Sequence, residues 1–219
     1  MLKYKCLVLD HDDTAVKSTA QVHYPSFKKT ISEIKPWLDI GEKEFLLNCF
    51  DPGFYEYMEK TLGFTESEMK YQLERWLEHI RTVIPEAYDG IKEVIVRQKS
   101  EGGIVCVVSH SYPEVIRRDY SARFGLQPDA IYGGDEPPER RKPSVFPLFD
   151  IMRRYNLKKE DVVVVDDLKP GLDMAKQAGV DFICAGWSHT VKEISDYMRA
   201  ECPVYLEDPS MLSSALFGD

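Results

Sequence analysis

Four short runs of apolar residues, without alternating polar positions, recur along the chain. They are KCLVLD (5–10), GIVCVVS (103–109), DVVVVDD (161–167) and VDFICAG (180–186). Strands that helices cover on both faces show this pattern. Amphipathic patterns near 112–124, 144–156 and 169–178 predict helices between the runs, with Gly125 and Gly179 at the expected helix ends. The alternation predicts an α/β fold with a doubly wound parallel sheet, which binds ligands at the carboxyl ends of its strands.

Residues 15–85 interrupt this alternation. The segment has no β-branched apolar run, and its apolar residues recur at helical spacing. One predicted helical face carries Met69, Leu73, Trp76, Leu77 and Ile80, and another carries Phe54, Met58 and Leu62 ahead of Gly63. We expect a small all-helical domain over 15–85, inserted into a core domain formed by 1–14 and 86–219. We call residues 15–85 the helical insert.

Composition narrows the class of protein. A chain of 219 residues with 43% hydrophobic content can bury one core with a smaller appendage. No apolar stretch approaches the roughly 20 residues that cross a bilayer, and no signal sequence is visible, so we expect a cytoplasmic protein without a membrane partner. The net charge of −9 argues against a nucleic-acid partner but permits a small anionic substrate. Monomer and homodimer both remain open.

The cysteines do not suggest disulfides. Cys6, Cys49, Cys106, Cys184 and Cys202 are odd in number and scattered, and three lie in strand-like runs. Buried reduced thiols are the expected state.

Acidic and polar residues end three of the apolar runs. Asp10 follows CLVL, Ser109 follows IVCVV, and Asp166 with Asp167 follows VVVV. A parallel sheet gathers these strand ends on one edge, where the carboxylates would repel each other unless a cation lay among them. Carboxylate oxygens suit Mg²⁺, so we expect Mg²⁺ as the cofactor.

These residues resemble the motifs of the haloacid dehalogenase superfamily, in its phosphatase branch with a helical cap, which includes phosphoglycolate phosphatases and beta-phosphoglucomutases. The first motif, Asp-x-Asp-x-Thr/Val, is similar to Asp10, Asp12 and Thr14. The second and third are similar to Ser109 and Lys142, and the fourth, an acidic pair, to Asp166 and Asp167. All four stand in order, and the resemblance covers essentially the whole chain.

The resemblance implies a role for each residue. Asp10 would be the nucleophile that becomes an aspartyl-phosphate, and Asp12 the general acid and then the general base. Mg²⁺ would be bound by Asp10, the backbone carbonyl of Asp12 and the acidic pair, with Asp167 favoured as direct ligand and Asp166 as second contact. The phosphoryl oxygens would be held by Ser109, the backbone N–H of His110, and Lys142, which also offsets the charge of Asp10.

Some positions depart from the family pattern. His11 stands where an apolar residue is usual, and it would either contact the leaving group or lie in a polar gap under the cap. Asp13 replaces a usual Gly or Ser and is expected to cap the following turn. Ser111, with Glu114 three residues later, predicts a capped helix start whose N–H groups face the phosphate.

The expected function is a Mg²⁺-dependent phosphatase of a small phosphorylated metabolite. Asp12 favours a phosphate ester, because family members that cleave carbon–halogen or carbon–phosphorus bonds lack this acid. A phosphomutase would share every core residue, and a non-catalytic phosphate-binding regulatory module is the rival from another class. Specificity is expected in the helical insert, where the candidates are His23, Tyr24, Tyr55, Arg75 and Trp76.

Overall fold

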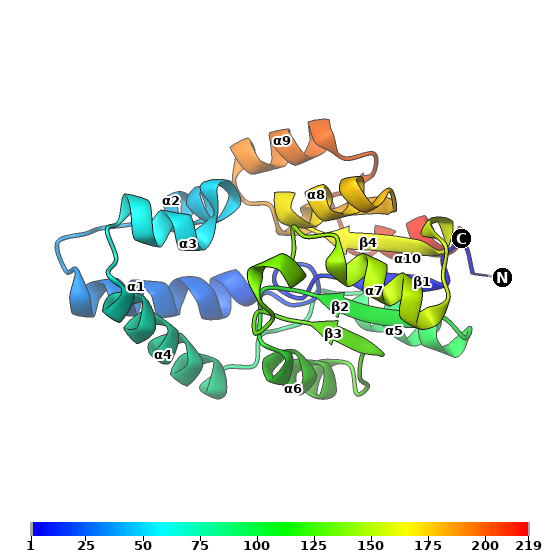
Figure 1. Ribbon diagram of the computed structural model, residues 1–219, viewed down its shortest axis with the longest axis horizontal. Helices are drawn as coiled ribbons and strands as arrows, with labels where there is room; N and C mark the ends of the chain where they lie inside the picture. Colours follow the sequence, from blue (N-terminus) through cyan, green and yellow to red (C-terminus); the bar gives the residue numbers. More distant parts are fainter. Residues whose placement is uncertain (1, 219) are drawn as a thin grey trace.

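The fold is built on a six-stranded parallel sheet, seen in a computed structural model that describes residues 2–218 (Figure 1). The strands lie in the order β3-β2-β1-β4-β5-β6. Their bounds are β1 Cys6–Leu9, β2 Ile104–Val108, β3 Ala130–Tyr132, β4 Val162–Asp166, β5 Asp181–Ala185 and β6 Tyr205–Leu206. The four predicted strands are confirmed as the four central ones, and the predicted doubly wound α/β fold is confirmed with them.

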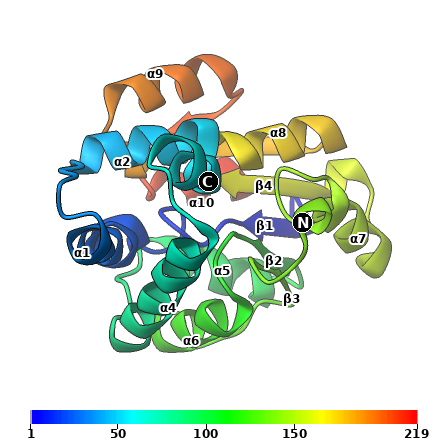
Figure 2. The same ribbon diagram turned by 60° about the vertical axis from the view of Figure 1, so that its left-hand side comes forward.

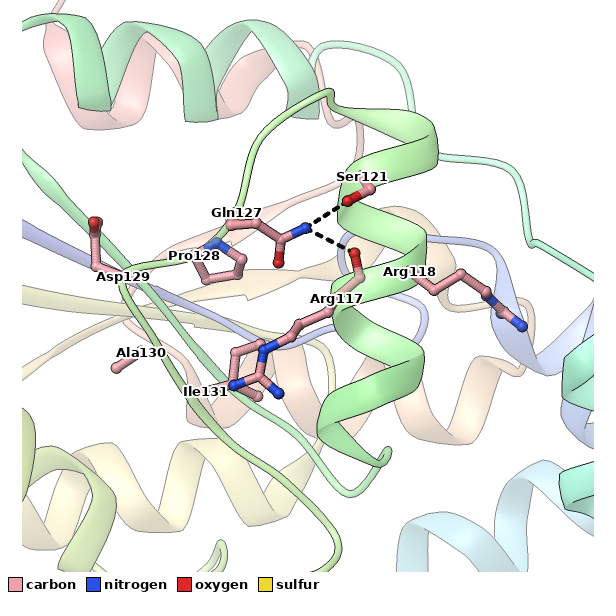
Figure 3. A pocket seen from close by; sticks show the side chains of 8 residues that line it. All are labelled: Arg117, Arg118, Ser121, Gln127, Pro128, Asp129, Ala130 and Ile131. Atoms are coloured by element: carbon pink, nitrogen blue, oxygen red, sulfur yellow. Dashed lines mark hydrogen bonds between the residues drawn. The ribbon is translucent and has the colours of Figure 1, made fainter.

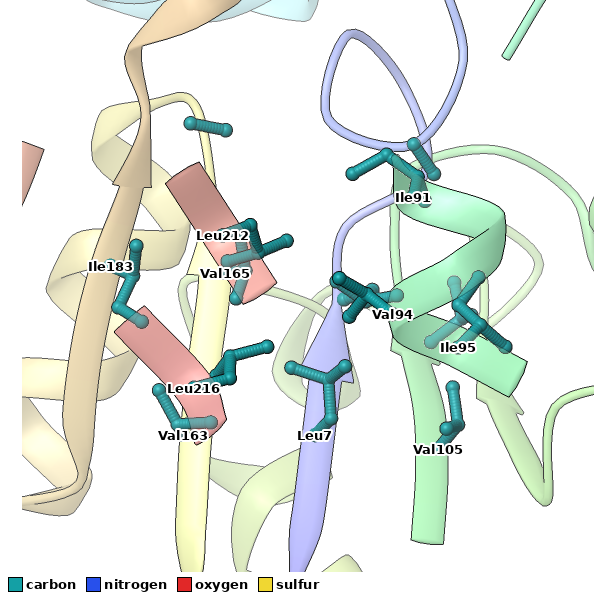
Figure 4. Packing of buried hydrophobic residues seen from close by; sticks show 14 of the residues in the cluster. Leu7, Ile91, Val94, Ile95, Val105, Val163, Val165, Ile183, Leu212 and Leu216 are labelled. Carbon is teal, nitrogen blue, oxygen red and sulfur yellow. The ribbon is translucent and has the colours of Figure 1, made fainter. Parts of the chain in front are cut away.

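The strands alternate their side chains between two cores, one on each face of the sheet. In β1, Leu7 and Leu9 point to one face, while Cys6 and Val8 point to the other. The first face packs against α5 (Ile91–Ser100), α6 (Pro113–Arg123) and α10 (Met211–Phe217). Figure 4 shows this packing, in which Leu7 and Val165 meet residues of α5 and α10. Both faces of the sheet are therefore covered, as the unbroken apolar runs predict.

The second face packs against three further helices. These are α7 (Phe146–Tyr155), α8 (Lys169–Ala178) and α9 (Lys192–Glu201). The helix predicted over 169–178 matches α8, and Gly179 ends it in the left-handed conformation. Short 3₁₀ helices cover Pro138–Arg140, Lys159–Asp161 and Gly186–Ser188.

The helical insert carries its own small core beside the carboxyl ends of the strands (Figures 1 and 2). Its α-helices are α1 Tyr24–Ile34, α2 Glu42–Asn48, α3 Phe54–Glu56 and α4 Glu66–Thr82, and π-helical turns cover Thr19–His23, Cys49–Gly53 and Tyr57–Thr61. Phe27, Phe45 and Tyr57 are buried among one another. A reciprocal cap by Thr65 and Glu68 starts α4.

Two local predictions need correction or extension. The predicted Ser111 cap is wrong, because α6 starts after Tyr112 with Pro113 in its first turn and has no side-chain cap. The five cysteines are free thiols within residues 2–218, as predicted, but Cys49 and Cys202 are only partly buried. None of the helices described is long and apolar enough to cross a membrane.

Candidate active site at the carboxyl edge of the sheet

Two adjacent central strands bring three predicted metal ligands together. Asp10 follows β1 directly, and its N–H donates to the carbonyl of Val165 in β4 at 2.9 Å. Asp166 is the last residue of β4, and Asp167 follows it. One carboxylate oxygen from each of Asp10, Asp166 and Asp167 lies within 4.8 Å of the others, and all three residues are buried. The strand register alone therefore assembles a buried acidic cluster.

Lys142 supplies the positive charge in this cluster. Its Nζ lies 2.8 Å from Oδ1 of Asp10 and 2.6 Å from Oδ2 of Asp166. Burial alone would lower the pKa of this ammonium, but the two carboxylates outweigh burial and raise the pKa. The lysine is therefore charged, and it neutralises only part of the charge on three carboxylates.

The remaining negative charge is visible in the pKa values of the acidic pair. Burial, together with the neighbouring carboxylates, raises the pKa of Asp167 well above its ordinary value. Burial also raises the pKa of Asp166 to about 6, although Lys142 opposes this. Oxygen donors that resist ionisation because of their neighbours are stabilised by a divalent cation. The donor set therefore fits Mg²⁺.

The acidic cluster is closely packed from below. A Cβ atom at Gly171, in the first turn of α8, would overlap the carboxyl group of Asp166, so only glycine allows this approach. The N–H of Leu168 donates to Oδ1 of Asp166 at 3.0 Å. Asp167 has weaker partners, the hydroxyl groups of Thr14 at 3.4 Å and Ser188 at 3.5 Å. Asp166 is thus held by its neighbours, and Asp167 has more oxygen capacity for another partner.

Asp12 faces a different set of groups. The hydroxyl of Ser109, at the end of β2, donates to Oδ2 of Asp12 at 3.0 Å. Nε2 of His23, from the helical insert, lies 3.0 Å from Oδ1 of Asp12. The indole N–H of Trp76 in α4 donates to Nδ1 of His23 at 3.0 Å. Because Nδ1 accepts, the ring carries its proton on Nε2 and donates it to Asp12.

These donors determine the ionisation of Asp12. Burial opposes ionisation, but the electrostatic attraction and the hydrogen bond of the His23 N–H outweigh it and hold the pKa of Asp12 well below its usual value. Asp12 is therefore a carboxylate in this structure, whereas Asp166 and Asp167 resist ionisation. Neighbouring carboxyl groups with opposite pKa shifts suit separate roles in acid–base chemistry.

His110 and Ser109 hold the loops around Lys142. A ring nitrogen of His110, Nε2, lies 2.9 Å from the carbonyl oxygen of Lys142. The N–H of Ser111 donates to the Ser109 hydroxyl at 3.1 Å. A Cβ at Gly134 would overlap the His110 carbonyl oxygen, so this loop also requires glycine. The two loops predicted to bind phosphate are therefore fixed against each other.

His11 and Asp13 lie on either side of Asp12 but contact other elements. His11 is buried, and its Nε2 lies 3.1 Å from Oδ2 of Asp119 in α6. Asp13, at φ 55°, accepts a hydrogen bond from the N–H of Thr19 at 3.0 Å, where the insert begins. The expected capping of the following turn by Asp13 agrees with this contact.

A surface hollow of about 390 Å³ lies away from the carboxylates, between α6 and β3 (Figure 3). Gln127 spans part of it by donating to the carbonyl of Arg117 and the hydroxyl of Ser121. The carboxylate that lines the hollow, Asp129, accepts hydrogen bonds from Lys99 and from the N–H of Val105. The hollow thus offers no cluster of reactive groups such as the one at the strand ends.

Sequence reasoning did not identify the partnership of Asp12 with His23. His23 was expected only as a specificity candidate. No spacing rule connects it to Asp12, because its ring is oriented by Trp76, which lies 53 positions after His23 in the sequence. Asp119 was missed entirely. The signal for it was the unusual polar residue His11, which needs a buried polar partner.

Comparisons with known proteins identify the family of the chain. The sequence profile of the family described as haloacid dehalogenase-like hydrolase matches residues 7–185. No curated protein sequence matches the chain.

Solved structures share the fold along nearly the whole chain. A CbbY variant from Rhodobacter sphaeroides, in complex with xylulose-(1,5)bisphosphate, is 21% identical, with a TM-score of 0.75 over 98% of this chain and 99% of that one. A predicted phosphoglycolate phosphatase from Haemophilus somnus is 18% identical, with a TM-score of 0.77 over 98% and 99% of the two chains. A Bacteroides vulgatus protein provisionally named as a beta-phosphoglucomutase is 17% identical, with a TM-score of 0.73 over 97% and 87%.

The profile spans β1 to β5, and so includes the strand ends that carry Asp10, Ser109 and Asp166. By this match the chain belongs to the haloacid dehalogenase-like hydrolase family.

Proposed function

We propose that this protein is a Mg²⁺-dependent phosphatase that hydrolyses a small phosphorylated metabolite through an aspartyl-phosphate on Asp10. The observation that carries the proposal is the buried cluster in which Lys142 lies between Asp10 and Asp166, with Asp167 beside them. This arrangement combines a nucleophilic carboxylate, a cation donor set and a fixed positive charge in one place.

The metal would be held by Asp10, Asp167 and the backbone carbonyl of Asp12, with Asp166 as a further contact. Asp167 is the better direct ligand of the pair, because Asp166 already binds Lys142 and the N–H of Leu168. When bound, the cation supplies positive charge that offsets the carboxylates and the phosphoryl oxygens.

The residues of the chain would divide the reaction between them. A carboxylate oxygen of Asp10 attacks phosphorus, and Lys142, Ser109 and the N–H of His110 hold the phosphoryl oxygens. Asp12 gives a proton to the leaving oxygen and then removes one from the water that hydrolyses the aspartyl-phosphate. Its position beside Ser109 supports this role, because both would then adjoin the phosphoryl group.

The helical insert, residues 15–85, would be the cap that encloses the substrate, with 1–14 and 86–219 as the core domain. Three contacts support this arrangement: Lys43 pairs with Glu193 at 2.7 Å, Phe50 packs on Tyr197, and the Arg141 guanidinium lies over the Tyr55 ring. The insert thus contacts the core around the site. We further propose a cytoplasmic location, as either a monomer or a homodimer.

The names of similar structures favour a phosphorylated substrate. One was solved with a sugar bisphosphate, and two bear the names of a phosphatase and a phosphomutase. A phosphomutase therefore remains the alternative within the same chemistry. It would pass the phosphoryl group of Asp10 to a second hydroxyl of the sugar instead of to water.

The test is phosphate release from p-nitrophenyl phosphate and a panel of phosphorylated metabolites, with Mg²⁺ or with excess chelator. Asp10→Asn should abolish turnover and leave the thermal melt intact, because an amide cannot attack phosphorus. Asp173→Asn, on the surface of α8, is the matched control. Folded Asp10→Asn with more than a few per cent of the wild-type rate would disprove the nucleophile, and full activity in chelator would disprove the metal. Isomerised sugar phosphate in place of free phosphate would identify a mutase.

A further inference from the structure

His11 lies between the two proposed catalytic aspartates, but its ring contacts Asp119 in α6. Its side chain is 1% exposed, and its Nε2 lies 3.1 Å from Oδ2 of Asp119, which is equally buried. Its carbonyl oxygen accepts from the N–H groups of Ala15 and Val16 at 3.0 and 3.1 Å. Because His11 is anchored by both its ring and its backbone, it fixes the path of the chain from Asp10 to Asp12.

Asp119 connects this loop to the place where the helical insert returns to the core. Its other oxygen, Oδ1, accepts from Nε of Arg118 at 2.7 Å and lies 2.6 Å from another nitrogen of the same guanidinium. The guanidinium also donates to the carbonyl of Val83 at 3.1 Å and to that of Ile80. Ile80 lies in the last turn of α4, so one unbroken chain of polar contacts runs from the end of the insert to His11.

The space around this chain is nearly filled. The cavity bounded by His11, Asp12, His23, Trp76 and Asp119 measures about 10 Å³, which is about the room of a single water molecule. A shift of α4 therefore cannot be absorbed by empty volume and moves the groups that Arg118 holds.

A second arginine on the same helix provides a comparison. Arg123 donates to the carbonyl of Pro85 at 2.7 Å and to that of Ile84, so it also binds the returning segment. Within residues 2–218, the hydrogen bonds of the Arg123 guanidinium go to these two carbonyls, whereas the Arg118 guanidinium also binds the carboxylate of Asp119. Of the two arginines, Arg118 is therefore the one whose contacts lead through Asp119 to His11. The returning segment also pairs directly with residues 15–17, through the N–H of Lys17 to Glu86 and the N–H of Tyr88 to Ala15.

We propose that Arg118 and Asp119 are positioning residues that couple the end of the helical insert to the catalytic loop through His11. This inference rests on the proposed phosphatase function for its effect on rate, but the coupling itself is a property of the fold. In the proposed reaction, closure of the insert over substrate would set the orientation of Asp10 and Asp12 by this route. Small misplacements of reacting groups can cost about 100-fold in rate.

The test compares Arg118→Met, Asp119→Asn and the control Arg123→Met in the full chain. For Arg118→Met and Asp119→Asn, kcat should fall about 10- to 100-fold with KM changed less than about threefold. Arg123→Met should lower the melting temperature similarly but leave kcat within about twofold. Arg118→Lys should lie between, because it keeps the charge, but its single nitrogen cannot replace the three guanidinium nitrogens that reach Asp119 and the two carbonyls. The double variant His11→Leu/Asp119→Asn should be no slower than its slower single variant, since both act on one path.

Amide hydrogen exchange provides a readout that does not depend on catalysis. Arg118→Met and Asp119→Asn should speed exchange over residues 10–14, whereas Arg123→Met should speed it over residues 83–88 and over 15–17, which pair with that segment. If wild-type protein turns over but the three variants lose rate and exchange protection alike, the coupling is refuted and the phosphatase function stands. If wild-type protein hydrolyses no ester but the exchange patterns differ as stated, the coupling stands and the phosphatase function fails.

Discussion

Asp167→Asn should stabilise the metal-free protein while removing its response to Mg²⁺. The substitution replaces a carboxylate with an amide of nearly the same shape. Carboxylate oxygens of Asp10 and Asp166 lie within 4.8 Å of one on Asp167. Repulsion between Asp167 and each of these two carboxylates, when both are ionised, costs about 3 kcal/mol at an effective dielectric constant of about 20. Lys142 offsets part of this repulsion, and the raised pKa of Asp167 agrees in direction, since burial and the neighbouring carboxylates oppose its ionisation. We therefore expect a gain of about 1–3 kcal/mol.

The assay is thermal unfolding at pH 8, in chelator and in Mg²⁺. At about 2–4 °C per kcal/mol for a chain of this size, the variant should melt several degrees above wild type in chelator. Wild type should gain stability with Mg²⁺, since a ligand that binds only the folded state stabilises it, and the variant should gain little. Asp173→Asn, which removes a surface ion pair with Lys169, should change neither result appreciably. A variant that melts lower in chelator, or that keeps the full Mg²⁺ response, would refute this account of the cluster.

Three further predictions concern the same site. With aryl phosphates, Asp12→Ala should release a burst of leaving group roughly equal to the amount of enzyme and then turn over slowly. Its rate should fall about 10²–10⁴-fold more with alkyl than with aryl esters. An equal fall in rate for both ester types, without a burst, would contradict the acid–base role of Asp12. Trp76→Phe removes the donor to Nδ1 of His23 and should lower kcat and change its pH profile, whereas Tyr71→Phe, on the exposed side of α4, should not. The pKa of Asp166 is about 6 in the folded protein, against an ordinary 3.8, so the metal-free protein should lose about 3 kcal/mol of stability from this group as pH rises from about 4 to 6. In urea titrations over this pH range, the free energy of unfolding should decline less steeply for Asp166→Asn than for wild type.

The central fold was predictable because both faces of its strands are buried. Runs such as VVVV in β4 contain no polar residue, and the helices that cover the strands carry clear amphipathic patterns. The edge strands β3 and β6 were missed because they are only three and two residues long and lack such runs. A short edge strand pairs on one side only, so its sequence needs little β pattern.

The site was predictable only as far as strand ends determine it. Asp10, Asp166 and Asp167 meet because they follow adjacent parallel strands, which sequence spacing can reveal. His23 reaches Asp12 through the packing of the helical insert, which has its own core. No strand register relates the insert to the sheet, so the sequence does not predict this contact. The Ser111 cap failed for a local reason, because its N–H is already bonded to Ser109 and the helix begins one residue later.

The partners of Asp12 place a condition on its proposed double role. Trp76 donates to one nitrogen of His23, so the other nitrogen must carry the proton, and it donates that proton to Asp12 together with the Ser109 hydroxyl. A carboxylate that accepts two such bonds is the basic form, ready to take a proton from water. To act as an acid toward the leaving oxygen, Asp12 must first gain a proton, and this requires that the contact with His23 be weakened or that the negative charge of the phosphoryl group raise its pKa. Because His23 and Trp76 both belong to the helical insert, the position of the insert sets which form of Asp12 is favoured.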